Sequence, residues 1–222
     1  RDQPRSRELG DVYKRQLLLV FPFFMVKNSF QYHHSGLSKF FSCQKDMFYR
    51  FMEQDNIDWR KLVYLVSIRL LNRISSRKDS KESLQCLIID DTDLPKTGFK
   101  TEMIGRIYSH VLHKSVLGFK GLFLCHTDGK TQTLLDFSLH GEEGKNPEKK
   151  QGLTDKQRKA RFSKKRDGDS AVNTRIKEYR QNKIDRSIEM VRESIRRGIR
   201  FDYLLVDSWF TCADLLNFIC SR

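Results

Sequence analysis

The sequence predicts an α/β domain in which helices cover a mixed sheet, preceded by a small helical region. Short apolar runs with β-branched residues, typical of buried strands, occur from residue 84 onward. Segments with a helical spacing of apolar residues follow these runs along the chain. A polar linker, SSRKDSKES at 75–83, separates a helical region over 25–78 from a sheet domain over 84–222.

Residues 1–24 are interpreted as a leader that is not part of the fold. A polar, basic stretch over 1–16 precedes ten apolar residues, LLLVFPFFMV, over 17–26. Ten residues are too few to span a bilayer, and no small-residue cleavage site follows them, so neither a membrane anchor nor secretion is expected. The apolar run is either a buried segment or translated sequence that was never selected to fold, with Met25 as a candidate start.

The helical region is expected to contain two or three short helices, with Ser42 and Asp58 as the N-caps of two of them. The first has apolar residues at helical spacing, namely Met47, Phe48, Phe51 and Met52. The second has an apolar stripe formed by Leu62, Val63, Val66, Leu70 and Ile74. Its basic residues are expected to face solvent or phosphate, namely Arg60, Lys61, Arg69 and Arg73. Such helices could form a small DNA-binding unit or a cap packed on the next domain, and the pattern fits both equally well.

The sheet domain is expected to contain four strands, at 84–89, 118–126, 131–139 and 203–206. The second and third flank the turn residues Asp128 and Gly129 and are therefore expected to form a hairpin. An amphipathic helix that ends at Gly198 is predicted from the spacing of Ile184, Ile188, Val191 and Ile195. A last helix is expected over 212–219.

Two acidic residues follow predicted strands. Asp91 comes after the strand LIID, and Asp207 comes after the strand YLLV. If these strands are parallel, both carboxylates emerge at the same edge of the sheet, where an unpaired buried charge is costly and a divalent cation relieves that cost. Carboxylate oxygens are preferred ligands of Mg²⁺. The alternative is that each Asp only caps a turn or a helix.

The charge of the chain indicates a polyanionic partner. The sequence has 42 Lys or Arg against 28 Asp or Glu, a formal net charge of +14. Residues 145–183 hold fourteen of these cations against five acids, a net charge of +9. A basic insertion over 142–183 is therefore expected to be a long loop that binds DNA, with candidate contacts at Lys156, Arg158, Lys159, Arg161, Lys164, Lys165 and Arg166. The alternative is a solvated charge run without a dedicated partner. The five cysteines form no CxxC pair and are expected to be reduced thiols of a cytoplasmic protein.

Three segments resemble the transposases of bacterial insertion sequences that carry a DDE triad on an RNase H-like fold, namely IIDDTDLPKTG at 88–98, YSHVLHKSVLGFKGL at 108–122 and YLLVDSWF at 203–210. The resemblance implies an RNase H-like domain and gives Asp91 and Asp207 as catalytic residues that bind Mg²⁺ or Mn²⁺. The third acid of the family, a Glu on a later helix, has no counterpart before Arg222. The chain is therefore expected to be a C-terminally truncated fragment.

The resemblance also implies the partners of the intact protein. These are double-stranded DNA, as terminal inverted repeats and as target, and a second copy of the chain that forms a homodimer when two ends are brought together. The expected location is the nucleoid of a bacterial cytoplasm. Two alternatives remain open, namely an RNase H-like nuclease without strand transfer and a catalytically inactive remnant that binds nucleic acid.

Overall fold

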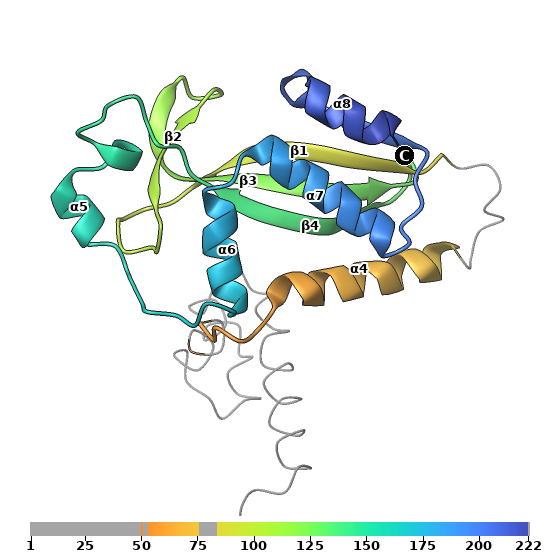
Figure 1. Ribbon diagram of the computed structural model, residues 1–222, viewed down its shortest axis with the longest axis horizontal. Helices are drawn as coiled ribbons and strands as arrows, with labels where there is room; N and C mark the ends of the chain where they lie inside the picture. Colours follow the sequence, from red (N-terminus) through yellow and green to blue (C-terminus); the bar gives the residue numbers. More distant parts are fainter. Residues whose placement is uncertain (1–49, 51–52, 76–83, 222) are drawn as a thin grey trace, which may run out of the picture. The chain divides into compact units, whose positions relative to one another are not determined.

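The computed structural model describes residues 50, 53–75 and 84–221 (Figure 1). The elements below belong to one compact unit, Asn56–Arg222. Its sheet contains the strands β1 (Cys86–Pro95), β2 (Gly105–Ser109), β3 (Lys114–Thr127), β4 (Gln132–His140) and β5 (Tyr203–Val206). Its α-helices are α4 (Trp59–Ser75), α5 (Asp155–Lys159), α6 (Ala171–Tyr179), α7 (Lys183–Arg196) and α8 (Ala213–Cys220). Two short 3₁₀ segments are η2 (Lys150–Gly152) and η3 (Ser208–Phe210).

The sheet is mixed, with β1 between an antiparallel and a parallel neighbour. β1 pairs antiparallel with β3 along its whole length and parallel with β5 from Cys86 to Ile89. Gly118 of β3 pairs with Pro95 of β1 and also with Gly105 of β2, so β2 lies on the other edge of β3 from β1. β4 continues along β3 from Lys120. This arrangement confirms the predicted mixed sheet flanked by helices and is consistent with an RNase H-like fold.

The core lies where alternate residues of the central strands meet the helices. Leu87 and Ile89 of β1 are fully buried because they sit two residues apart and so share one face of the strand. The same cluster contains Leu124 of β3 and Met190 of α7. Figure 1 shows α7 lying across the sheet, and Phe210 after β5 completes this core. The core therefore fixes β1, β5 and α7 relative to one another.

The predicted hairpin and the predicted C-terminal elements are confirmed. β3 and β4 pair across a turn in which Asp128 Oδ1 accepts hydrogen bonds from the backbone N–H of Lys130 and Thr131, at 3.0 and 2.7 Å. β5 has the predicted bounds, and α7 and α8 lie within a residue or two of the expected helices. Gly198 follows α7 with φ +78°, the left-handed conformation expected of a helix-ending glycine.

The prediction for β1 was too short. β1 runs from Cys86 to Pro95, so Asp91 lies within the strand and does not follow its end. The acidic residues remain in the strand because β3 pairs with all of this segment, as far as Pro95 with Gly118. β2 was not predicted at all.

The predicted buried face of α4 was also wrong. Asp58 caps this helix as expected, since its carboxylate accepts a hydrogen bond from the N–H of Lys61 at 2.9 Å. However, Val66 and Leu70 are half exposed, whereas Tyr64 and Ser67 are buried. Arg60 is not on the solvent side either, because it forms an ion pair with Asp136 of β4 at 2.7 Å. This polar network and the contact of α4 with β4 set the orientation of the helix in place of the apolar stripe. The helix predicted after Ser42, and the leader over 1–24, lie outside the described residues.

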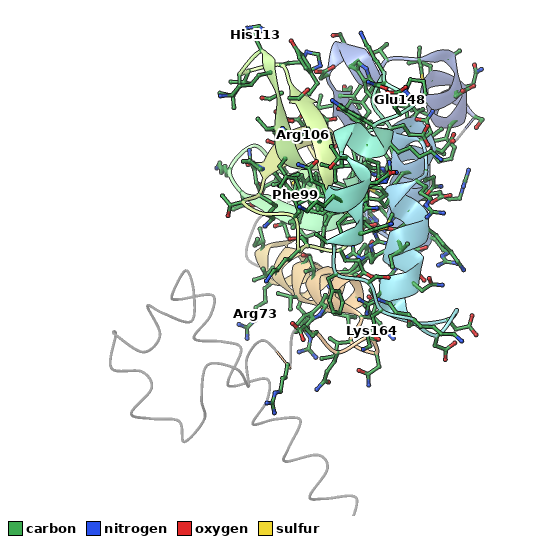
Figure 2. All side chains as sticks on the ribbon, turned by 90° about the vertical axis from the view of Figure 1, so that its left-hand side faces the viewer. Arg73, Phe99, Arg106, His113, Glu148 and Lys164 are labelled. Carbon is green, nitrogen blue, oxygen red and sulfur yellow. The ribbon has the colours of Figure 1, made fainter. Side chains whose placement is uncertain are left out.

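The basic insertion over 142–183 is partly helical, which corrects the expectation of a long loop. It contains η2, α5 and α6. Thr154 is the N-cap of α5 and forms a capping box with Gln157. Figure 2 views the end of the domain that carries this insertion, with Glu148 and Lys164 labelled. The insertion is attached to the segment after β1 because the N–H of Phe162 donates to the carbonyl of Lys100 at 2.8 Å.

Candidate active site

Asp91 projects from the central strand on its core side. Side chains alternate along β1, so Asp91 shares the face of buried Ile89, whereas Asp90 points to the other face and is exposed. The parallel pairing with β5 ends at Ile89 and Val206. Beyond that point β5 no longer covers β1, and the Asp91 carboxylate reaches the edge where β5 ends.

Asp207 is the first residue after β5 and caps η3. Its carboxylate accepts a hydrogen bond from the backbone N–H of Trp209, and its carbonyl accepts one from the N–H of Phe210 at 3.1 Å. Phe210 is buried in the core, so this turn is anchored. The local sequence Asp-Ser-Trp-Phe therefore fixes the Asp207 carboxylate at the carboxyl end of β5.

Lys183 connects the two acidic residues. It is the first residue of α7, whose N-cap Asn182 accepts a hydrogen bond from the N–H of Ile184 at 2.8 Å. The Lys183 ammonium forms an ion pair with the Asp91 carboxylate and lies 4.0 Å from the centre of the Trp209 ring. Trp209 in turn donates its backbone N–H to the Asp207 carboxylate, so both predicted residues lie near the carboxyl end of β5.

Another acid on β1, Asp93, has its charge balanced by a lysine. The carboxylate of Asp93 lies 2.5 Å from Nζ of Lys120 on β3. Burial would raise the pKa of Asp93, but hydrogen bonds from Lys120 and Ser109 outweigh it and hold the pKa below its usual value. Asp93 therefore stays ionised with a protein partner, while Asp91 is the acid of this strand that faces the end of β5.

The donor atoms suit a hard divalent ion. Asp91 and Asp207 supply carboxylate oxygens, which Mg²⁺ and Mn²⁺ prefer, and a lysine now balances part of their charge. In the part of the chain that the structure describes, no three His, Cys, Asp or Glu side chains are grouped to hold a metal ion. The two carboxylates fit a metal that keeps water or substrate oxygens as its other ligands.

A family model described as DDE superfamily endonuclease matches residues 37–221. The chain belongs to this family. Enzymes of the superfamily act on DNA and generally depend on divalent metal ions. Searches of curated proteins and of solved structures returned no match to the chain.

The predicted DNA contacts of this DDE endonuclease fall into two groups. The first is exposed and consists of Lys156, Lys159, Lys164 and Lys165. The second is turned toward protein atoms. Arg161 donates to the carbonyl of Ile104 at 3.1 Å, Arg166 pairs with Glu102 at 2.6 Å, and Arg158 pairs with Asp155. Arg161 and Arg166 therefore attach the insertion to the segment before β2, whereas the ion pair of Arg158 lies within α5.

Sequence reasoning missed Lys183 and Trp209 of the endonuclease. Lys183 was counted only as one cation of the basic insertion, and Trp209 only as part of the motif YLLVDSWF. The signal that was available is the position of Lys183 directly after the N-cap Asn182, which places it at the start of a helix.

For the described residues, no helix has the length and apolar character needed to cross a membrane.

Proposed function

We propose that this endonuclease is a DNA transposase that cleaves the ends of an insertion sequence and joins them to target DNA. The observation that carries the proposal is the convergence of Asp91 and Asp207, the two acids of the resembling motifs, on one Lys183–Trp209 pair at the carboxyl end of β5. The same resemblance extends over the β2–β3 hairpin, which carries the segment at 108–122. The bound DNA is double-stranded, as terminal inverted repeats and as target.

Asp91 and Asp207 are proposed to hold Mg²⁺ or Mn²⁺. When bound there, such an ion supplies a more acidic water and stabilises the leaving oxygen of a phosphodiester. The protein contributes the placement of the two carboxylates. The Trp209 N–H orients Asp207, and the backbone pairing of β1 with β3 orients Asp91. No side chain of the protein needs to form a covalent intermediate in this reaction.

The partners proposed beyond DNA follow from the same function. Joining two ends requires that both are held at once, so a homodimer is proposed for the assembled complex. The formal charge of +14 favours the DNA-rich nucleoid of a bacterial cytoplasm as its location. Each of these statements depends on the transposase proposal.

The test is to sequence the DNA on both sides of the coding region and to assay the protein made from the complete reading frame. We expect inverted repeats around the gene and, in the next helix of the reading frame, a Glu as the third acid. With those repeats as substrate, the protein should nick DNA and join ends only with Mg²⁺ or Mn²⁺. Asp91→Asn and Asp207→Asn should reduce both steps to background while DNA binding in EDTA is kept. Asn keeps an oxygen that can accept the Trp209 N–H hydrogen bond, so a loss of activity reports on charge.

Two other outcomes would reject the transposase. Metal-dependent nicking without joined products would indicate a nuclease of the same fold. Binding of DNA with no cleavage in either metal would indicate a remnant whose acids no longer act. Retained cleavage in both Asn variants would remove Asp91 and Asp207 from the chemistry altogether.

A further inference from the structure

The insertion and the segment that carries Met103 line an open cavity of about 790 Å³ on the side of the domain seen in Figure 2. Four cations line it, namely Lys150, Arg158, Arg161 and Arg180. Glu143 is the one acidic residue in its lining. Like charges repel one another, so this lining is most stable when an anion occupies the space. A cavity of this size can hold a ligand as large as a nucleotide.

Hydrogen bonds to the rest of the domain hold the side chains of the cavity in place. The Arg161 guanidinium donates to the carbonyl of Ile104 at 3.1 Å and also to the side-chain oxygen of Gln151. The side-chain amide of Gln151 donates in turn to the hydroxyl of Tyr179 at 3.1 Å. Tyr179 is buried against Phe119 of the sheet, with ring centres 6.1 Å apart. Arg161 is therefore held by a chain of contacts that ends in the core.

Backbone strain is concentrated at the same cavity. Among the described residues, three that are not glycine have positive φ, namely Met103, His113 and Gln151, and the first and last of these line the cavity. Such conformations cost free energy and tend to persist where a ligand site requires them. Arg158 adds a further sign, because its Nη1 is buried and has no hydrogen-bond partner among the described residues. An anion bound in the cavity would give this buried N–H group a hydrogen-bond acceptor.

The cavity lies close to the candidate active site along the chain. Arg180 ends α6 and Lys183 begins α7, so at most about 11 Å of backbone separates a lining residue from the partner of Asp91. The link between them is fixed. His140 Nδ1 donates to the carbonyl of Gln181 at 3.2 Å, and the Gln181 side chain donates to Glu189 at 2.7 Å. A single DNA strand could therefore contact both the cavity and the candidate active site.

We infer that this cavity, between η2, the segment after α5 and the end of α6, binds a phosphodiester group of the DNA strand that is cleaved at Asp91. The inference rests on the proposed function for the identity of the strand, while the anion site itself rests on the lining. Lys150 and Arg180 are exposed at its rim and meet the phosphate from solvent. Arg158 and Arg161 supply the deeper, fixed charges.

The test uses the double variant Lys150→Gln, Arg180→Gln in the full chain. Its matched control is Lys130→Gln, Lys177→Gln, which removes the same charge from exposed residues outside both the lining and the predicted DNA contacts. Binding of a deoxynucleoside 5′-monophosphate is measured by calorimetry, and binding of a labelled duplex and a labelled single strand is measured by fluorescence anisotropy against salt concentration. All measurements are made in EDTA, so they do not depend on cleavage.

We expect the rim variant to bind the mononucleotide at least tenfold more weakly and the control to bind it as the unchanged protein does. For DNA, the slope of log affinity against log salt should decrease by about 1 in the rim variant, as expected when one phosphate contact is lost. Equal effects of the two variants on DNA, with no effect on the mononucleotide, would overturn the inference in favour of a diffuse basic surface. If the rim variant binds the mononucleotide more weakly but binds DNA as the unchanged protein does, the inference that the cavity binds DNA is also overturned. If the unchanged protein binds the mononucleotide and DNA through the rim but does not cleave DNA when Mg²⁺ or Mn²⁺ is added, the proposed function is rejected and the anion site is not.

Discussion

Replacing Lys183 with Met should strengthen metal binding at the candidate active site. The Lys183 ammonium now pairs with the Asp91 carboxylate, so a divalent ion on that carboxylate must displace the ammonium or lie beside a like charge. Methionine has a similar length and can keep its contact with the Trp209 ring, so the change removes charge with little loss of packing.

The size of the effect follows from the geometry. The side chains of Lys183 and Asp91 are 21% and 25% exposed, and an ion pair of this kind contributes about 1 kcal/mol. The ammonium lies 4.0 Å from the Trp209 ring centre, and this contact contributes a further 0.5 to 1 kcal/mol, roughly. If the metal breaks only the ion pair, Lys183→Met lowers its Kd about fivefold, and if it breaks both contacts, by a factor of about 13 to 30.

The assay is a titration with Mn²⁺ in which the electron paramagnetic resonance signal of the free ion is followed. Asp91→Asn identifies the site, because saturable binding there should be lost. Lys177→Met is the matched control, since Lys177 is an exposed lysine of α6 and the change removes the same charge. An unchanged or higher Kd for Lys183→Met would refute the reasoning. An equal decrease in the control would show that only the overall charge of the protein matters.

Two further predictions concern stability. Glu178→Gln should lower the free energy of unfolding by about 3 kcal/mol, because it removes one of the two buried carboxylates that pair with Arg60 and Arg186 and leaves only Asp136 to balance both guanidinium charges. Glu148→Gln at an exposed position should change it by less than about 0.5 kcal/mol in denaturant titrations. Equal effects would show that the buried pairs do not stabilise the fold. Burial raises the pKa of Tyr179 to about 12, above its usual value of 10, so its contribution to stability is complete below pH 10 and is lost as the pH rises toward 12. Tyr179→Phe should therefore flatten the decrease of stability between pH 10 and 12, and an identical decrease in both proteins would contradict this.

Much of the fold could be predicted because local patterns specify it. The turn residues Asp128 and Gly129 fix the hairpin, and the spacing of apolar residues before Gly198 fixes α7. The orientation of α4 could not be predicted this way. It depends on Arg60, whose partners Asp136 and Glu178 are distant in sequence, 118 residues away in the case of Glu178.

The candidate site shows the same division. Asp91 and Asp207 could be proposed because each lies in a recognisable motif next to an apolar strand. The length of β1 could not be read from its sequence, because the pairing of its acidic half with β3 holds residues there that have low strand propensity. Lys183 is 92 residues from Asp91, and their contact exists only once α7 has packed on the sheet. No periodicity encodes such a contact.

The parallel pairing of β1 with β5 has a consequence for the order of events during synthesis. The N–H of Gln85 donates to the Asp202 carboxylate at 2.8 Å, which joins residues 117 positions apart. The hairpin of β3 and β4 can form soon after it leaves the ribosome, whereas β5 must wait until most of the chain has been made. The basic insertion, over 142–183, can therefore assemble in a nascent chain before β5 brings Asp207 to the end of β1 beside Asp91.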